Sequence, residues 1–416
     1  MDEKHERELR RKAVRLSLVG LTPRAILERI GRSRRWLFKW LKRFEEEGWA
    51  ALKSASRRPQ STPRQYTRQA HKLVTRVRQR LEKRKVGLVG ARSIQRELQR
   101  TRLLRRIPTA ATLYRWLHTD GVLKSSRRKP AEIYHPHPTP ALRYILHLMD
   151  WTLRYLEGGA KVYAFHTIEV TRRDLRQTIS PDKSYASARQ HVLYVWRTLG
   201  VPNGLQIDND SAFNGGHRAS RIISQFVRLC LLVGVEPIFI PVEEPKWNGL
   251  VEGVHSLWAR SFWRRQHFRS LAHARRAAPE FETWYKRDYL LTQSDGTAVA
   301  PQPLRPRWRL TAQQVHALPD QLPITAGRIH FIRQVDPDGD IELLEETWHV
   351  HKRLAGQYVW ATITTQNQQL SIYYRRAANK PVRLVKLYHY ALPEPIVPRQ
   401  PEFKRPYRRR RMCTML

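Results

Sequence analysis

The chain has 416 residues, which at roughly 100–200 residues per domain leaves room for three or four units. It carries 77 Lys and Arg against 36 Asp and Glu, and a net charge of +41 would repel itself unless a polyanion neutralised it. Two cysteines, Cys230 and Cys413, and the lack of any run of about 18 apolar residues exclude a disulfide framework, a paired-cysteine zinc site and a membrane-spanning helix. We therefore expect a cytoplasmic protein that binds nucleic acid, with an anionic membrane surface or the ribosome as alternative polyanions.

Residues 6–47 are predicted to form three helices. Thr22 caps the second helix with Pro23 in its first position, Ser33 caps the third, and the third ends at Gly48. An apolar face follows helical spacing along the third helix: Leu37, Trp40, Leu41 and Phe44.

The rest of that third helix is basic, and its charged side chains are candidate DNA contacts: Arg34, Arg35, Lys39, Lys42 and Arg43. A basic third helix after a short glycine turn favours a helix-turn-helix DNA-binding domain over residues 1–52. The alternative is a plain three-helix bundle with a solvated face.

A second helix-turn-helix unit is predicted over residues 66–123, between polar, proline-containing linkers at 53–65 and 124–142. Thr109 or Pro108 would open its last helix.

Several side chains of this region have competing interpretations. Trp116 is expected in the core, Tyr114 is left open between the core and a DNA phosphate, and Arg115 is a candidate DNA contact. His135 and His137 have no third ligand nearby, so we interpret them as loop histidines rather than metal ligands.

From residue 143 the pattern changes to strands alternating with helices, and we expect an α/β core over residues 143–295. Three strands are followed by helix, strand, helix, strand and helix, which predicts a mixed sheet with helices on its faces. The expected strands are 143–151, 161–170, 174–179, 204–208 and 235–240, and the expected helices are 184–199, 221–234 and 248–265.

Two of these strands are expected to finish in an aspartate, Asp150 and Asp208. A carboxylate at the end of a buried strand costs several kcal/mol unless it has a partner, and open α/β sheets place their sites at strand ends. Divalent ions prefer oxygen ligands, and two metal ions that share about three carboxylates can clamp an in-line phosphoryl displacement. The segment VEEPKWNGLVEGVH at 242–255 is where we expect the third carboxylate.

Three segments of the core resemble motifs of the DDE transposases and retroviral-type integrases, in the bacterial insertion-sequence branch. MDWT at 149–152 resembles the family's first-aspartate strand, IDNDSAF at 207–213 its second-aspartate motif, and PKWNGLVEGVH at 245–255 its glutamate motif. The tandem helix-turn-helix units and the C-terminal strands also resemble the family's layout.

This resemblance implies a ribonuclease-H-like core in a transposase or integrase that cuts donor DNA and joins its 3′-hydroxyl to target DNA. Asp150, Asp208 and Glu252 would be the catalytic residues and would hold two Mg²⁺ or Mn²⁺ ions. The implied partners are double-stranded DNA, as element ends and as target, and further copies of the chain in an oligomer on DNA, in the bacterial cytoplasm near the nucleoid. The alternatives are a non-catalytic DNA-binding regulator or inactive transposase remnant, and a nuclease with the same core.

The chain departs from the family's pattern in two places. Asp210 stands where the family usually has glycine; we interpret it as a turn residue, with a metal ligand as the alternative. The family usually has 35 residues between its second aspartate and its glutamate, and this count reaches Glu244 rather than Glu252. Glu244 precedes Pro245, which disfavours helical geometry, whereas Glu252 lies in a helix that Asn248 can cap. We therefore predict Glu252 as the ligand.

The longer spacing to Glu252 is expected to be taken up in the loop around 215–221. Lys246, Asn248 and His255 are predicted DNA contacts. Asn248 would also shape the start of its helix, and His255 could instead orient the carboxylate or be an ordinary surface histidine.

The C-terminal region is divided into three parts. Residues 296–322 are predicted to be a proline-rich linker, and 323–395 a small β-barrel of short strands with a hairpin signal at Asp338 and Gly339. Residues 396–416 form a basic tail. The barrel and tail would hold DNA non-specifically, while the N-terminal helical units would recognise the element ends.

Overall fold

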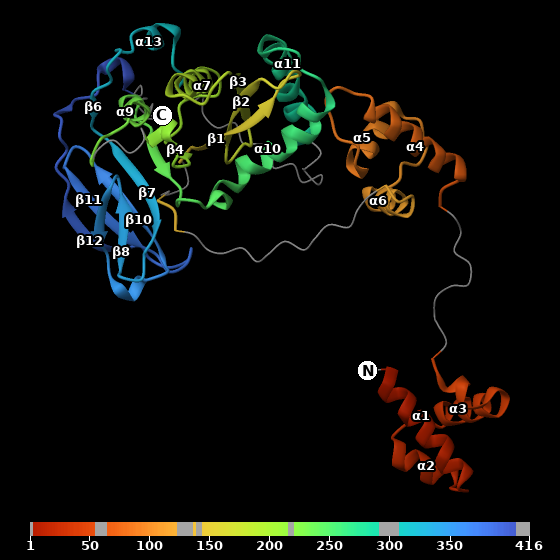
Figure 1. The fold of residues 1–416 in the computed structure, drawn as a ribbon. Helices are drawn as coiled ribbons and strands as arrows, with labels where there is room; N and C mark the ends of the chain where they lie inside the picture. Colours follow the sequence, from red (N-terminus) through yellow and green to blue (C-terminus); the bar gives the residue numbers. More distant parts are fainter. Residues whose placement is uncertain are drawn as a thin grey trace, which may run out of the picture. The chain divides into compact units, whose positions relative to one another are not determined.

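A computed structural model describes residues 3–54, 65–122, 136–138, 144–214, 220–290 and 308–404 (Figure 1). The chain divides into two compact units, Met1–Thr67 and Arg68–Leu416. Most of the two predicted N-terminal linkers, the predicted insertion at 215–219 and the last part of the tail lie outside the described residues. In the part of the chain that is described, no helix is long and apolar enough to cross a membrane.

The first unit contains three helices, α1 (Glu3–Leu18), α2 (Pro23–Ile30) and α3 (Arg34–Glu47), followed by a 3₁₀ turn at Gly48–Leu52. Both predicted N-caps are confirmed, because Thr22 accepts a hydrogen bond from the Ala25 N–H and Ser33 accepts one from the Trp36 N–H. The predicted apolar face of α3 is also confirmed: Leu37 and Trp40 are buried, and Leu41 and Phe44 pack against the core.

The second unit begins with α4 (Arg68–Glu82), α5 (Ala91–Thr101) and α6 (Ala110–Thr119). Thr109 caps α6 by accepting a hydrogen bond from the Thr112 N–H at 3.2 Å. Trp116 packs against the core of these three helices, as predicted, whereas Tyr114 is exposed.

The segment after α4 joins these helices to the α/β core. The Arg265 guanidinium donates hydrogen bonds to the carbonyls of Leu81, Glu82 and Arg84 at 2.7–2.9 Å. The Gly87 N–H donates to the Ser261 carbonyl at 2.9 Å. These helices are therefore packed onto the core rather than tethered to it.

Within the described residues, the core sheet has nine strands in the order β12-β11-β10-β7-β5-β4-β1-β2-β3. β1 pairs in parallel with β4 and antiparallel with β2, so the predicted mixed sheet is confirmed. Its first five strands are β1 (Leu146–Tyr155), β2 (Lys161–Glu169), β3 (Leu175–Ser180), β4 (Gly204–Ile207) and β5 (Glu236–Phe239).

Helices cover both faces of this sheet. Met149 of β1 packs in the apolar cluster that includes α7 (Tyr185–Thr198) and α9 (Gln225–Val233). Its neighbour Leu148 packs in the cluster of α10 (Gly249–Ser261) and α11 (Leu271–Trp284) on the opposite face. Neighbouring strand residues point to opposite faces, which explains why the β1 sequence is apolar without alternation.

The C-terminal strands extend this sheet, and the described residues form no closed barrel, which corrects the barrel prediction. β7 pairs in parallel with β5 through Ile238 with His330 and Phe239 with Phe331. Backbone groups of β5 that would otherwise be unpaired are thereby satisfied. Figure 1 shows the extension as blue strands: β7 (Arg328–Gln334), β10 (Tyr358–Thr364), β11 (Gln369–Tyr374) and β12 (Arg383–His389).

Short elements complete the C-terminal region. β8 (Asp340–Leu343) and β9 (Glu346–His349) form a hairpin, and β6 (Ile324–Thr325) pairs with β13 (Ile396–Val397). The predicted linker at 296–322 contains α13 (Ala312–His316).

The hairpin predicted at Asp338 and Gly339 is wrong, because the strands on either side of this turn pair with other strands. The two-residue hairpin turn is Leu344 and Glu345, both with positive φ (47° and 66°). Neither residue type signals such a turn, which usually takes Asn or Gly.

Candidate active site at the carboxylate cluster

The two predicted aspartates lie where the β1–β4 pairing stops. Asp150 is in the middle of β1 rather than at its end, which corrects the prediction, because β1 continues against β2 with Asp150 opposite His166. β1 pairs with β4 only as far as Leu148 with Gln206, and Asp208 follows β4 directly. Both aspartates therefore lie two residues beyond the last pair that joins β1 to β4.

The negative charges of Glu252 and Asp210 affect the pKa values of these aspartates. Burial raises the pKa of Asp150 to about 7, with further contributions from the charges of Asp208, Glu252 and Asp210. Burial also raises the pKa of Asp208 to about 6; a hydrogen bond from the Asp210 N–H and the charge of Lys183 oppose this rise, and the Asp210 charge adds to it. Crowded carboxylates with raised pKa values are typical of sites that bind a cation or exchange protons.

The two candidate glutamates have different surroundings. Glu252 lies in the first turn of α10 and is half-buried, and its carboxylate accepts no hydrogen bond from the described part of the chain. Glu244 accepts hydrogen bonds from the Trp247 indole at 2.8 Å and from the Tyr358 hydroxyl, and it pairs with Lys246 at 2.9 Å. The carboxylate of Glu244 is thus committed to structural contacts, whereas Glu252 has its carboxylate available for a ligand.

Asn248 connects the three elements that carry the acidic residues. Its side chain is buried, its Nδ2 donates to the Met149 carbonyl at 3.2 Å, and its Oδ1 accepts from the Gln206 Nε2 at 3.1 Å. Asn248 stands at the N-cap position of α10 but makes no capping bond with its side chain, which corrects that part of the prediction. The amide instead fixes the helix start against β1 and β4.

Other predicted loop residues also have contacts. His137, predicted as a loop histidine, lies within hydrogen-bond distance of the Gln206 Oε1 (2.9 Å), and burial lowers the pKa of His137 to about 4. Asp210 accepts a hydrogen bond from the Ala212 N–H at 2.9 Å and another from Lys183 at 2.7 Å. Asp210 is not among the described residues with positive φ. These contacts agree with a turn residue that opens α8 (Ser211–Asn214).

His255 and Lys246 differ in their closeness to the aspartates. The Nδ1 of His255 lies 3.9 Å from an oxygen of Asp150, the side chain is mostly buried, and burial lowers the pKa of His255 to about 4. Lys246 is exposed and pairs with Glu244. The position of His255 suits the alternative of orienting a carboxylate, and DNA contact by His255, Lys246 and Asn248 stays a prediction.

The candidate DNA contacts of the helical units lie mainly on the surface. Arg34, Arg35, Lys39 and Lys42 are exposed on α3. Arg43 lies over the Trp40 ring at 5.2 Å. On α6, Arg115 is exposed, and its guanidinium donates to the Thr112 hydroxyl at 3.4 Å. Their contact with DNA stays a prediction.

The described residues contain no group of three His, Cys, Asp or Glu side chains close enough to hold a metal ion. The acidic residues around Asp150 offer only oxygen donors, with His255 as a nearby nitrogen. An oxygen donor set suits a hard divalent cation such as Mg²⁺ or Mn²⁺.

Sequence reasoning missed Lys183 and Arg333, which contact the loop after Asp208, and Tyr358, which holds Glu244. Lys183 donates to Asp210, Arg333 donates to Asn209 next to Asp208, and Tyr358 donates to Glu244. Lys183 directly precedes the helix cap Ser184, which is a weak signal. Nothing in the sequence connects Arg333 or Tyr358 with segments more than a hundred residues away.

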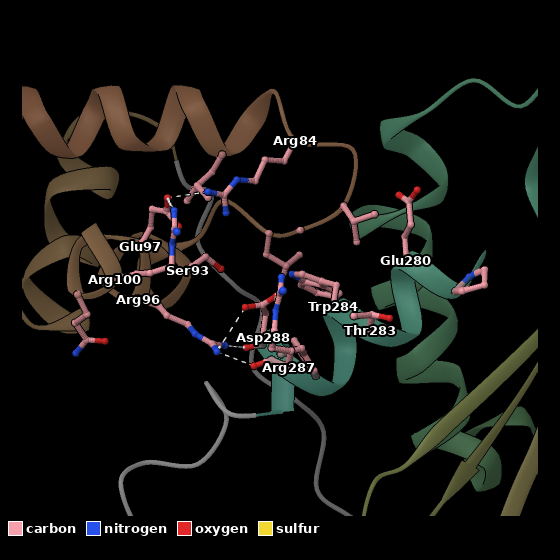
Figure 2. A pocket seen from close by; sticks show the side chains of 17 residues that line it. Arg84, Ser93, Arg96, Glu97, Arg100, Glu280, Thr283, Trp284, Arg287 and Asp288 are labelled. Carbon is pink, nitrogen blue, oxygen red and sulfur yellow. Dashed lines mark hydrogen bonds and ion pairs between the residues drawn. The ribbon is translucent and has the colours of Figure 1, made fainter. Parts of the chain in front are cut away.

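A separate pocket of about 1100 Å³ lies between α5 and the end of α11, and none of the candidate catalytic residues lines it. Figure 2 shows Arg96 of α5 pointing toward Arg287 and Asp288, and its guanidinium donates to the Arg287 carbonyl at 2.6 Å. The pocket therefore belongs to the contact between the α4–α6 helices and the α/β core.

Comparison with known protein families identifies the class of domain at the N-terminal end of the chain. A family described as winged helix-turn helix matches residues 10–68, so the chain contains a helix-turn-helix domain that overlaps the predicted one at 1–52 and extends past it. No curated protein matches the chain.

Particular solved structures show some similarity to the chain. Two structures of the HTLV-2 integrase catalytic core domain with magnesium are 16% and 18% identical in sequence to this chain, and both have a TM-score of 0.23. The aligned parts cover 28% and 29% of this chain, and 67% and 69% of the two integrase chains. A simian T-cell lymphotropic virus intasome in complex with a PP2A regulatory subunit is 13% identical, covers 72% of this chain and 96% of that chain, and has a TM-score of 0.29. Because these scores are low, the candidate site rests on its own geometry.

Proposed function

We propose that this protein is a DNA strand transferase of the transposase and integrase kind, with a ribonuclease-H-like core. The observation that carries the proposal is the placement of Asp150 in β1, Asp208 directly after β4 and Glu252 in α10, with the charges of Asp208 and Glu252 both acting on Asp150. The helix-turn-helix match and the net charge of +41 support DNA as the substrate.

In this proposal Asp150, Asp208 and Glu252 hold two Mg²⁺ or Mn²⁺ ions, which would activate an attacking 3′-hydroxyl and stabilise the leaving oxygen. Because no three ligands are gathered in the described residues, the side chains must shift when an ion binds. Asn248 would keep the three elements in register, and the basic side chains of α3 would hold the element end. Copies of the chain would assemble on the two ends.

The test is a joining assay with duplexes that carry the DNA sequences on either side of the gene, a supercoiled target plasmid, and Mg²⁺ or Mn²⁺. Joined strands are expected from the natural protein and none from Asp150→Asn. Asp338→Asn is a matched control, because it removes the same charge from an exposed residue of the turn between β7 and β8.

Other products would identify the alternatives. Free nicks without joined strands would favour a nuclease. Specific DNA binding with neither nicking nor joining would favour a regulator or an inactive remnant. Normal joining by Asp150→Asn would contradict the catalytic assignment.

A further inference from the structure

Arg333 reaches from the C-terminal part of the sheet into the loop that follows Asp208. Its guanidinium donates hydrogen bonds to the Asn209 Oδ1 at 2.9 Å, to the Ile240 carbonyl at 3.1 Å and to the Glu342 carbonyl at 3.1 Å. The Asn209 Nδ2 in turn donates to the same Ile240 carbonyl at 2.7 Å. Arg333 and Asn209 therefore form a closed set of hydrogen bonds around the residue after Asp208.

Arg333 is held mainly by hydrogen bonds to uncharged oxygens. Within the described residues it forms no ion pair, and its hydrogen-bond partners there are carbonyl and amide oxygens. The Arg333 side chain is half-buried, with its guanidinium over the Phe331 ring at 5.2 Å and the negative charge of Glu342 nearby. An apolar residue could not replace Arg333, because the planar guanidinium donates several hydrogen bonds and fixes their acceptors in one geometry.

Asn209 is held from a second side as well. Its backbone carbonyl accepts a hydrogen bond from the Asn214 Nδ2 at 2.8 Å, across the short helix α8. With the side chain held by Arg333 and the backbone held by Asn214, the loop between Asp208 and α8 has little freedom. The Asp208 side chain can then rotate toward an ion from a backbone that stays in place.

We infer that Arg333 is a positioning residue for Asp208, so that the C-terminal extension of the sheet supports the active site rather than only holding DNA. This inference rests on the proposed function, because it takes Asp208 as a catalytic residue. It assigns the C-terminal strands a role beyond the DNA-holding role expected from the sequence.

The first test compares Arg333→Met with Arg328→Met in the full-length protein. Arg328 lies on the same strand and pairs with Glu236 at 2.6 Å, at the other end of β7, so its loss removes an arginine contact remote from Asp208. For Arg333→Met we expect the single-turnover joining rate to fall by about 10–100-fold, the usual effect of losing a residue that orients a ligand. The dissociation constant for end DNA should not change.

A second readout does not depend on activity. Hydrogen–deuterium exchange over residues 207–214 should become faster in Arg333→Met and stay unchanged in Arg328→Met. Asn209→Ala breaks the same contact from the loop, without altering the sheet, and so serves if Arg333→Met folds poorly. Because Arg333→Met and Asn209→Ala remove one shared contact, the double variant should be no slower than the worse single variant.

The outcomes separate the inference from the proposed function. Equal losses of joining, DNA binding and melting temperature in both arginine variants would reduce Arg333 to a fold-stabilising residue and overturn the inference. An unchanged joining rate in Arg333→Met would also overturn it. A natural protein that joins no strands would instead contradict the proposed function, and the exchange measurement would still report whether Arg333 holds the Asp208 loop.

Discussion

Asn248 donates a hydrogen bond to the carbonyl of Met149, the residue directly before Asp150 (3.2 Å). Because Gln206 donates to the same Asn248 side chain, one buried amide joins both aspartate-bearing strands to the start of the Glu252 helix. The three acidic residues are thus held in register by a residue that is itself uncharged.

Replacing Asn248 with leucine, a side chain of similar size, should destabilise the protein. The Met149 carbonyl loses its side-chain donor and Gln206 loses one acceptor, and an unsatisfied buried polar group costs about 1–3 kcal/mol. Urea denaturation of the variant should show this loss, and Lys246→Leu, a surface change on the same segment, should show far less. Equal stability of Asn248→Leu and the natural protein would contradict the linking role.

The choice between the two glutamates is tested by paired substitutions. Glu252→Gln should abolish strand joining while leaving DNA binding intact, because the glutamine has lost the negative charge that a metal ligand supplies. Glu244→Gln keeps an acceptor oxygen for Tyr358 and Trp247, so joining should persist with a small loss of stability. The reverse pattern would assign the ligand to Glu244.

Asp150→Asn should stabilise the metal-free protein at high pH. The folded state raises the pKa of Asp150 from 3.8 to about 7, so the stability from this group is present below pH 4 and is lost as the pH rises through 7. In EDTA at pH 8 the free energy of unfolding of the variant should exceed that of the natural protein by about 1–4 kcal/mol, at about 1.4 kcal/mol per pKa unit. Denaturation curves from pH 4 to 8 test this, and a gain that does not shrink toward pH 4 would argue against charge crowding.

Removing residues 1–67 should abolish end-specific binding and leave the remaining chain folded, because the first compact unit ends there and holds most of the helix-turn-helix match. A longer deletion, through residue 122, would also remove Val86 and Leu88 from the apolar cluster that contains α11, so it should lower the melting temperature of the remaining chain. Gel shifts with specific and scrambled ends, together with melting curves, test both expectations. Retained discrimination by the 68–416 chain would move recognition to α4–α6.

Basic residues on α3 should contribute to the salt dependence of DNA binding. Each phosphate contact accounts for about one unit of slope in a plot of log K against log salt, so Arg35→Ala and Lys39→Ala should each reduce the slope by about 1. Lys12→Ala on the exposed side of α1 is a control of equal charge change. Equal slope changes in all three variants would mean that net charge, rather than a contact surface, drives binding.

Some features of this structure could be predicted because they depend on residues that are close together in the sequence. The caps at Thr22, Ser33 and Thr109 depend on side chains only three residues from the N–H groups they bind, so sequence reveals them. The position of Asp208 at the end of β4 was also predicted from the strand pattern. The position of Asp150 within β1 was not predicted, because an apolar run does not show how far pairing with β2 continues.

Long-range pairing accounts for most of what the sequence did not reveal. The β5–β7 ladder depends on which open strand edge is available, and strand propensity carries no such information. Likewise, the hydrogen bond from Arg333 to Asn209 joins residues 124 positions apart. The turn at Leu344 and Glu345 escaped prediction because its conformation is imposed by the two strands it connects.

The continuous sheet has a consequence for how this protein can be divided. A chain cut before residue 323 would not release an independent module; it would leave β5, with Ile238 and Phe239, as a bare outer strand. Such a strand invites a second polypeptide to pair with it, which leads to aggregation. The C-terminal strands thus protect the α/β core from self-association, and they cannot be exchanged for those of another protein without rebuilding that boundary.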